Sequence, residues 1–133
     1  MDKYRVSLGF FGEEKAAEYL KLDGYKILER NYRCEYGEID IIASRGKTLC
    51  FVEVKTRSDN KFGSPIEAVV ELKRRRMYKS AKAYMAARPD TRGFETVRFD
   101  AFEVYAQKQG NGFILCDIKY WKDIIEDASV FEE

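Results

Sequence analysis

The most constraining feature of this sequence is a pair of apolar, strand-forming runs that carry charges at alternate positions. The stretch from residue 37 to residue 57, GEIDIIASRGKTLCFVEVKTR, contains the runs IDIIA and LCFVEV on either side of a short turn-forming segment. This pattern predicts a β-hairpin whose strands are largely buried. Because a buried charge needs a partner, Asp40, Glu53 and Lys55 raise the question of what balances them.

The second strand of this hairpin changes character along its length. Side chains alternate between the two faces of a strand, so Glu53 and Lys55 share one face with the apolar Phe51. That face turns from apolar to charged as the strand proceeds, which is typical of a strand that leaves the core and enters a cleft. If the turn centres on Arg45-Gly46, Asp40 lies opposite Phe51 and diagonal to Glu53 on the same face.

Two carboxylates at a diagonal spacing of about 7 to 8 Å can converge on one ion. Because like charges repel, a divalent cation is the simplest way to keep Asp40 and Glu53 ionised, and hard oxygen ligands favour Mg²⁺ or Mn²⁺. Lys55 would project into the same space, where it could orient water or stabilise charge on a phosphate. Glu13 lies on the inner stripe of a preceding helical pattern and would add a third acid. Glu38 stands further from the turn, so it is left outside the predicted metal site.

A solvated strand face is the alternative interpretation. For the E-V-K triplet alone, an exposed charged pair is the commoner explanation. The flanking apolar runs, the matching parity of Asp40 and the inner position of Glu13 favour a site instead, because three carboxylates and one lysine do not neutralise one another.

The remaining sequence predicts the other elements of a single α/β domain. Apolar periodicity indicates a first helix over residues 7–22, and a capping box from Ser64 to Glu67 begins a long helix that Pro89 ends near residue 87. The inward stripe of that long helix is expected to contain Ile66, Val69, Val70, Met77, Ala81 and Tyr84.

Alternating apolar positions predict three further strands, at residues 25–33, 96–105 and 113–119, with a turn at residues 107–112 between the last two. A short helix is expected around residues 121–125. The element order is therefore α-β-β-β-α-β-β, in one domain over residues 1–125 that an acidic tail at residues 126–133 follows.

Residue types that are rare or absent exclude several classes of site. The chain has no histidine, which excludes Ser/His/Asp triads and histidine-ligated zinc or iron. Cys34, Cys50 and Cys116 form no CxxC pair, so we expect core thiols in a reducing compartment. Charged residues make up 35% of the chain but leave a net charge of +1, so any attraction to nucleic acid must come from local clusters. The amino-terminal segment lacks a long apolar run, and we expect a cytoplasmic protein with no membrane partner.

These residues together resemble a known pattern. The motif D-x(12)-E-V-K, with a glutamate on the preceding helix, is similar to the PD-(D/E)xK signature of restriction-endonuclease-like nucleases, although Ile39 stands where that signature has proline. A wider set of motifs resembles the YraN family of bacterial proteins, which is similar to archaeal Holliday-junction resolvases. That set comprises Gly12-Glu13, Gly24-Tyr25, Arg30-Asn31, GEIDIIA, FVEVKTR, Phe62-Gly63, Glu67-Ala68-Val69, Lys73, Ala81 and the RFD motif at Arg98 to Asp100.

The resemblance implies a restriction-endonuclease-like fold, with a central mixed five-stranded sheet flanked by helices, and a Mg²⁺-dependent or Mn²⁺-dependent reaction. Asp40 and Glu53 match the metal-binding acids, Lys55 matches the catalytic lysine, and Glu13 matches the helix-borne acid. The carbonyl group of Val54 would add a metal ligand.

Polar residues near this predicted site indicate where a nucleic acid could bind. Thr56 and Arg57 continue the catalytic strand and could meet a phosphate backbone, with exposed edge residues as the equal alternative. Lys73 and Arg74 belong to a basic run on the long helix, for which a solvated face is as good an explanation as phosphate contacts. Lys73 also interrupts the inward stripe, so we expect it to reach the cleft or to pair with an acid.

Other residues of the chain have structural explanations. Arg98 and Asp100 are expected to pair with each other within the sheet rather than to serve the site. Most aromatic residues should be core, with base stacking as the less favoured alternative for Tyr32 and Tyr36 near the hairpin.

The sequence thus predicts a metal-dependent endonuclease that acts on branched or duplex DNA, with RNA as a further candidate substrate. A homodimer is a candidate assembly, because two-fold dimers are common among nucleases of this fold. Two alternatives stay open. One is a non-catalytic nucleic-acid-binding or assembly module that keeps the fold and its acids, and the other is a structural protein whose acids form internal ion pairs.

Overall fold

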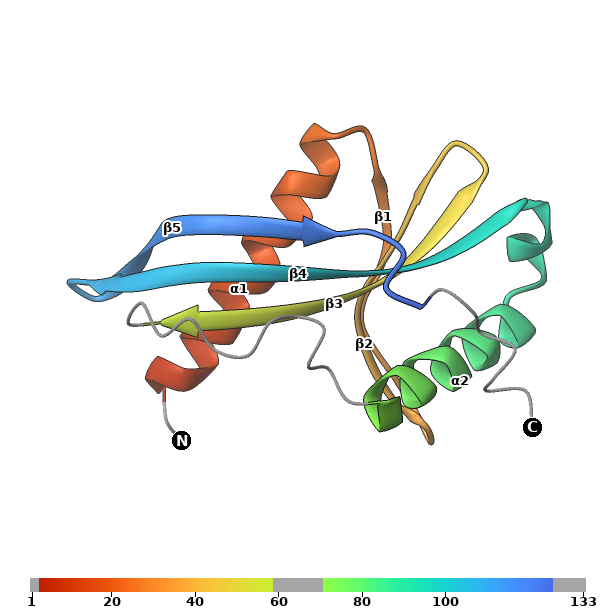
Figure 1. The fold of residues 1–133 in the computed structure, drawn as a ribbon, viewed down its shortest axis with the longest axis horizontal. Helices are drawn as coiled ribbons and strands as arrows, with labels where there is room; N and C mark the ends of the chain where they lie inside the picture. Colours follow the sequence, from red (N-terminus) through yellow and green to blue (C-terminus); the bar gives the residue numbers. More distant parts are fainter. Residues whose placement is uncertain (1–2, 59–70, 126–133) are drawn as a thin grey trace.

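A five-stranded sheet with a helix on each face forms the described part of the protein (Figure 1). The computed structural model describes residues 3–58 and 71–125. Its elements in chain order are α1 (Lys3–Leu22), β1 (Lys26–Cys34), β2 (Gly37–Arg45), β3 (Thr48–Ser58), α2 (Glu71–Ala87), the short 3₁₀ helix η2 (Pro89–Gly93), β4 (Thr96–Gln109) and β5 (Gly112–Trp121). The predicted α/β layout and its order are therefore confirmed, and η2 is an addition that the sequence patterns did not predict.

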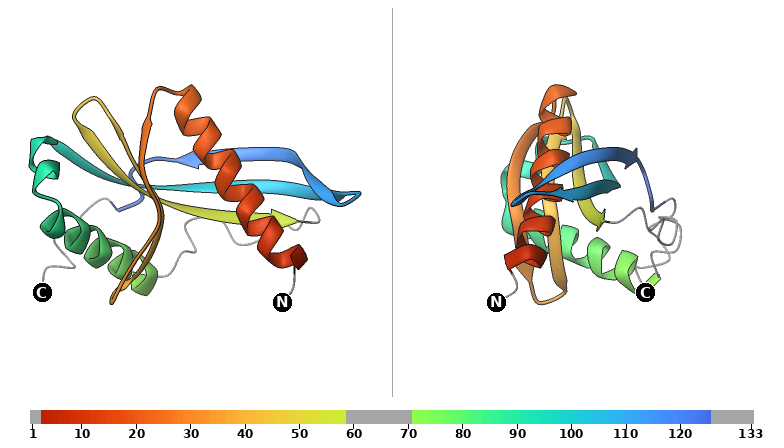
Figure 2. Two further views of the ribbon diagram at one scale, coloured as in Figure 1. Left: turned by 180° about the vertical axis from the view of Figure 1, so that it is seen from behind. Right: turned by 90° about the vertical axis from the view of Figure 1, so that its left-hand side faces the viewer.

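The strands lie in chain order across the sheet, and every neighbouring pair is antiparallel except β3 and β4. Parallel neighbours need a crossover connection, and α2 belongs to the chain between these two strands. Helix α1 lies behind β3, β4 and β5 in Figure 1 and in front of them when the molecule is turned (Figure 2). Helix α2 packs mainly against β2, on the other face of the sheet.

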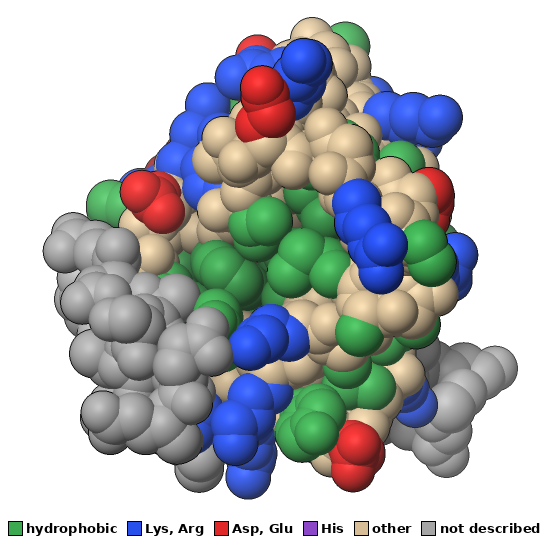
Figure 3. Space-filling model, turned by 90° about the vertical axis from the view of Figure 1, so that its right-hand side faces the viewer, with side chains coloured by type: hydrophobic (Ala, Val, Ile, Leu, Met, Phe, Trp, Pro, Cys, Tyr) green, Lys and Arg blue, Asp and Glu red, His purple; other side chains and the backbone are tan. Residues whose placement is uncertain are grey.

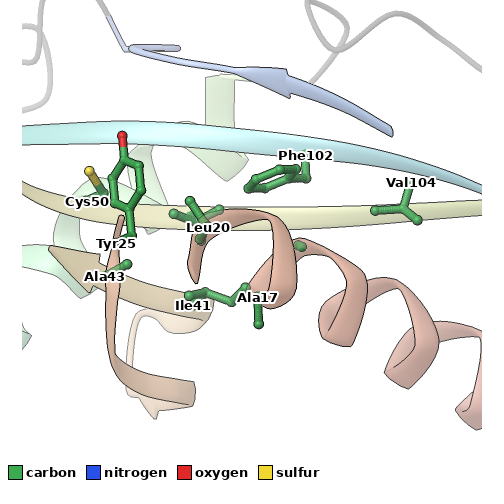
Figure 4. Packing of buried hydrophobic residues seen from close by; sticks show 10 residues of the cluster. Ala17, Leu20, Tyr25, Ile41, Ala43, Cys50, Phe102 and Val104 are labelled. Atoms are coloured by element: carbon green, nitrogen blue, oxygen red, sulfur yellow. The ribbon is translucent and has the colours of Figure 1, made fainter. Parts of the chain in front are cut away.

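The core on the α1 side depends on small residues of the helix. Ala16, Ala17 and Leu20 are all buried, as their spacing predicts, and the two alanines leave room for the helix to come close to the sheet. This cluster also contains Tyr25, Ile41, Ala43, Cys50, Val52, Phe102 and Val104 (Figure 4).

Helix α1 approaches β3 closely at Gly12. A Cβ atom on this glycine would overlap Oγ1 of Thr56 and lie 2.8 Å from its Cβ atom. Thr56 therefore packs against α1, on the face of β3 opposite to Glu53 and Lys55. The glycine is what allows this contact between helix and strand.

The core on the α2 side contains Ile39, Ile42, Leu49, Phe51, Met77, Ala81, Tyr84, Phe99 and Ile125. The α2 members of this cluster are three of the predicted inward residues, and the helix ends before Pro89 as predicted. The capping box and the inward residues Ile66, Val69 and Val70 lie outside the described residues, as does the acidic tail. On the side of the molecule where α2 ends, hydrophobic side chains gather in a hollow bordered by lysine and arginine side chains (Figure 3).

The register of the hairpin differs from the predicted one. Ile42, not Asp40, pairs with Phe51, and Arg45 pairs with Thr48, so the loop consists of Gly46 and Lys47. Gly46 has a φ of 60°, which suits a two-residue hairpin loop. The prediction that Asp40 lies opposite Phe51 is therefore wrong by two residues. A shift of two preserves which face each side chain occupies.

The chain after β4 also departs from the predicted pattern. The hairpin between β4 and β5 is longer than expected, because its turn is confined to residues 110–111. The predicted helix at residues 121–125 is wrong: Trp121 ends β5 and the next four residues are irregular. Two hydrogen bonds hold them beside β4, from the Asp123 N–H to Asp100 Oδ1 (2.9 Å) and from the Ile124 N–H to the Phe99 carbonyl (2.7 Å).

The cysteines and the helices bear on two further expectations. All three cysteines are free thiols, but only Cys50 is buried, whereas Cys34 is half-buried and Cys116 is exposed. The expectation of core thiols therefore holds for Cys50 alone. Within residues 3–58 and 71–125, no helix combines the length and the apolar character needed to cross a membrane.

Replacing Gly12 tests the contact between α1 and β3. Gly12→Ala should lower the free energy of unfolding by about 1–3 kcal/mol, the usual cost of overpacking, measured by urea denaturation. Gly9→Ala is the matched control, because nothing lies within 4 Å of a Cβ atom there. The control should be neutral or stabilising by up to about 1 kcal/mol. Equal stability of the two variants would contradict the close contact.

Candidate functional site

A pocket of about 500 Å³ opens beside the first residues of β2, the middle of β3 and the first turns of the described part of α2. It brings together Asp40 and Glu53 from the two hairpin strands with Lys73 from the helix. The residues that line it are Gly37, Glu38, Asp40, Glu53, Lys73, Arg76 and Met77.

Asp40 is held where the ladder between β2 and β3 ends. The last backbone pair of the two strands is Ile41 with Val52, and beyond it the Val54 N–H donates a hydrogen bond to Asp40 Oδ2 (2.7 Å). A side chain thus replaces the next rung of the ladder. Continuing the register by one residue places Asp40 beside Glu53, nearer than the diagonal position that the sequence suggested.

The pKa of Asp40 is raised to about 7, chiefly by burial. The hydrogen bond from Val54 lowers it, whereas the charges of Glu53, Glu13 and Glu38 raise it further. Burial and like charges both disfavour the ionised form of a carboxyl group. Asp40 is therefore the acid of this group whose ionised form its surroundings disfavour most.

Glu53 has a counter-ion from α2. The Lys73 ammonium lies 2.6 Å from Glu53 Oε1, and the Glu53 side chain is only 18% exposed. The expectation that Lys73 reaches the cleft and pairs with an acid is thus met by a single contact. A cation already stands at one of the two predicted metal ligands.

Glu13 is close to this group but does not line the pocket. Its carboxyl group is hydrogen-bonded to the side chain of Asn31, and the Arg30 guanidinium lies 4.0 Å from its Oε1. Burial raises the pKa of Glu13, an effect that Asn31 and Arg30 oppose and Glu38 adds to. Glu13 therefore contributes to the electrostatics of Asp40 from a neighbouring position.

The donor set at Asp40 and Glu53 fits a hard divalent cation. Mg²⁺ is usually held by one or two carboxylates, with water and phosphate oxygens as the other ligands. Both acids line one pocket, and an ammonium group already balances one of them. Across residues 3–58 and 71–125, however, no three Asp, Glu or Cys side chains are grouped as a metal site. Two of the predicted acids are brought together, and Glu13 is not brought into a three-acid centre.

The other predicted residues of the metal site lie beside the pocket rather than in it. Val54 meets Asp40 through its N–H, and its carbonyl group makes no described contact with the acids. Lys55 is exposed, and its backbone lies opposite Glu103 in the ladder between β3 and β4. It shares a face with Glu53 but does not line the pocket.

The predicted nucleic-acid contacts fall in three different places. Thr56 packs against α1 at Gly12, so it faces away from the pocket. The Arg57 Nε atom lies 3.6 Å from Glu103 on β4. Arg74 and Lys73 border a smaller hollow next to the pocket, which Glu53 also lines. Of these side chains, only that of Lys73 lines the main pocket.

Several residues at the site were not predicted to belong to it, among them Arg76, which lines the pocket. Glu38, which its distance from the turn excluded, lines the pocket, pairs with Arg33 (3.2 Å) and raises the pKa of Asp40. Asn31 bonds to Glu13 and has a φ of 54°, a left-handed conformation that asparagine tolerates better than most residues. The sequence signal for Asn31 was its place next to Arg30 in the family motifs.

Arg98 and Asp100 pair within the sheet, as predicted, and away from the pocket. The Arg98 Nε atom donates to Asp100 Oδ1 (2.9 Å), and Asp100 is fully buried. The hydroxyl group of Tyr120 donates to Asp100, and Arg98 donates to Tyr25. Burial and the hydrogen bond to Asp100 raise the pKa of Tyr120, an effect that Arg98 opposes. The network is a satisfied part of the core.

The region that contains the pocket matches a protein family. The model of the uncharacterised protein family UPF0102 matches residues 12–104. The chain belongs to this family. UPF0102 is the YraN family that the motifs indicated, so that prediction is confirmed. The matched region contains the four predicted catalytic residues Glu13, Asp40, Glu53 and Lys55.

Curated UPF0102 proteins are similar along most of the chain. The chain is 40% identical over 128 residues to a UPF0102 protein of Clostridium perfringens, which covers 96% of this chain and 98% of that protein. A UPF0102 protein of Caldicellulosiruptor saccharolyticus is 51% identical over 98 residues, 74% of this chain and 81% of that one. A UPF0102 protein of Parafrankia is 48% identical over 109 residues, 80% of this chain and 91% of that one.

The raised pKa of Asp40 makes the stability of the protein depend on pH. A carboxyl group whose pKa is higher in the folded than in the unfolded chain contributes stability at low pH, and this contribution is lost as the pH rises through the folded value, about 7 here. Asp40→Asn removes the charge and keeps an acceptor for Val54. The variant should match the parent near about pH 4 and be more stable by roughly 2–4 kcal/mol at about pH 8.

Denaturant titrations at a series of pH values measure this difference. Glu95→Gln serves as the control, because its carboxylate is exposed and pairs only loosely with Lys47 (3.8 Å). A constant difference between Asp40→Asn and the parent across the pH range would contradict the shifted pKa.

Proposed function

We propose that this UPF0102 protein is a divalent-metal-dependent nuclease that hydrolyses phosphodiester bonds in DNA. The observation that carries the proposal is the meeting of Asp40 and Glu53 in one pocket, where β2 and β3 separate and burial raises the pKa of Asp40 to about 7. A partly buried acid whose ionised form is disfavoured by burial and by like charges is suited to a bound cation. The resemblance of the hairpin to PD-(D/E)xK nucleases, and the order of the elements, support the same proposal.

The residues in and beside the pocket would have different roles in such a reaction. Mg²⁺ or Mn²⁺, when bound, would polarise a phosphate group and lower the pKa of a water molecule. Asp40 and Glu53 would hold the ion. Lys73, no longer needed as the counter-ion of Glu53, could then donate a hydrogen bond to a phosphate oxygen. Lys55 would approach the phosphate from the exposed end of the same strand face.

A second candidate function is a nucleic-acid-binding or assembly module without turnover. The position of Lys55 favours it, because the expected catalytic lysine is exposed and outside the pocket that holds both acids. The Lys73–Glu53 pair would then serve as a permanent internal ion pair. Binding of a divalent cation separates the two candidates from a purely structural role.

Metal binding is the first test of the proposal. Calorimetric titration of the parent with Mn²⁺ should show binding that Asp40→Asn and Glu53→Gln weaken by about tenfold or more, because each removes a charged ligand. Lys73→Met should strengthen it, because the ammonium competes for Glu53. Lys82→Met, an exposed lysine on the same helix, is the control. Equal affinities in parent and Glu53→Gln would remove the metal-site interpretation.

Cleavage is the second test. The protein is incubated with branched, flapped, single-stranded and linear duplex DNA and with RNA, in Mg²⁺ or Mn²⁺, beside Glu53→Ala, Lys55→Ala and the control Glu95→Ala. The parent and Glu95→Ala should cut at least one DNA substrate, and Glu53→Ala should lose about a hundredfold or more in rate, the scale of lost metal or electrostatic catalysis. Metal binding without cleavage of any substrate would leave the binding module as the function.

A further inference from the structure

Beyond the pocket, the face of the sheet that carries Glu53 presents polar and aromatic side chains from three neighbouring strands. On β3, Glu53 and Lys55 lie beside Ala101 and Glu103 of β4. On the other side of β4, Ala101 pairs with Trp121 and Glu103 pairs with Lys119 of β5, while Tyr105 pairs with Asp117. Because paired residues point to the same face of a sheet, these side chains share the face that carries Glu53.

This face is the one that α1 does not cover. The opposite face of β4 presents Phe102 and Val104 to the α1 core, so Glu103 and Tyr105 point the other way. In Figure 1, α1 lies behind β3, β4 and β5, and α2 lies toward the β2 side of the sheet. Among the described residues, a row of mostly polar side chains therefore continues on this face from the pocket along β3, β4 and β5.

Glu103 is buried although α2, the described helix on this face, packs mainly against β2. Its exposure is 4%. Trp121 Nε1–H donates to Oε1 (3.0 Å), the Tyr105 hydroxyl donates to Oε2 (2.9 Å), and Arg57 lies 3.6 Å away. One carboxylate thus fixes two aromatic rings and a guanidinium group on the sheet surface.

The ring of Trp121 stays accessible in this arrangement. The residue is 37% exposed even though its indole N–H is bonded. Lys119 lies beside it on β5, with its ammonium 5.6 Å from the centre of the Tyr105 ring, and Lys55 lies across Glu103 on β3. The set therefore combines fixed aromatic rings with three cations, Lys55, Arg57 and Lys119, around the buried carboxylate of Glu103. Asp117, the other acid of the set, is paired with Tyr105, farthest from Glu53.

We propose that this surface binds unpaired nucleotides, with a base stacked on Trp121 and phosphates met by Lys55 and Lys119. Fixed aromatic rings beside cations are the usual means of binding single-stranded nucleic acid. Trp121 lies two strands from Glu53, about 10 Å, so one bound strand reaches both. The inference rests on the proposed nuclease function and narrows its substrate to DNA with unpaired bases, such as a branch, flap or single strand.

The test uses the only tryptophan of the chain as a reporter. Tryptophan emission is followed while the full-length protein is titrated, without divalent metal, with a single-stranded oligodeoxynucleotide, a blunt duplex and an abasic strand of equal length. The single strand should quench the emission strongly, and the duplex and abasic strand should quench it little. Fluorescence anisotropy of labelled strands measures binding in parallel.

Variants separate stacking from loss of structure. Trp121→Ala should weaken binding of the single strand by about tenfold, whereas Trp121→Phe, which keeps a ring, should restore most of it. Phe10→Ala removes an aromatic ring that is 61% exposed on α1 and should bind like the parent. Glu103→Gln keeps an acceptor for the Trp121 indole N–H. Circular dichroism of this variant, compared with that of the parent, shows whether the fold survives the loss of the charge.

Three results would overturn the inference: no binding of single strands, binding that leaves both the emission and the Trp121→Ala affinity unchanged, or equal quenching by the abasic strand. Because the titrations contain no metal, they are independent of catalysis. Binding of single strands and quenching of the Trp121 emission can therefore be observed even if no substrate is ever cut. Failure of the nuclease proposal and failure of this surface are therefore distinguishable.

Discussion

The hydrogen bond from the Val54 N–H to Asp40 Oδ2 is the interaction on which the candidate site depends. At this point β2 and β3 stop pairing through their backbones, and without a replacement the two strands would separate with their acids apart. The side chain of Asp40 spans the gap and is thereby held toward β3, beside Glu53. One bond thus terminates the hairpin ladder and positions a carboxylate at the mouth of a pocket.

Asp100 and Asp40 differ in how many hydrogen-bonding partners the fold gives them. Asp100 is fully buried but receives bonds from Arg98, Tyr120 and the Asp123 N–H, so the fold itself satisfies its charge. Asp40 receives one bond and otherwise faces other acids, and burial raises its pKa to about 7. The fold thus supplies Asp100 with three hydrogen-bonding partners but supplies Asp40 with one. This contrast is the reason why the proposed function rests on Asp40 and not on Asp100.

Strand alternation and family motifs together predicted the element order, the buried face of α1 and the face shared by Asp40 and Glu53, because these depend on local periodicity. The exact register was not predictable, since it depends on whether Gly46 and Lys47 form the whole loop. The wrongly predicted helix at residues 121–125 has a tertiary cause: hydrogen bonds to Asp100 and Phe99 hold that segment beside β4 in an irregular conformation. Glu38, which was left outside the predicted metal site, lines the pocket because the pocket follows the divergence of the strands rather than the distance from the turn.

The pairing of Lys73 with Glu53 balances one of the acidic charges of the pocket. Its ammonium group neutralises one acid at 2.6 Å and leaves Asp40 to remain partly protonated near neutral pH. A divalent cation placed between the acids would balance both, and it would release a lysine that is itself 46% exposed and able to turn toward solvent. Lys55, by contrast, already lies in solvent on the strand face that leads to Trp121. This arrangement of charges is what the proposed function draws on, with an ion and a phosphate in the pocket and a bound strand on the adjoining sheet face.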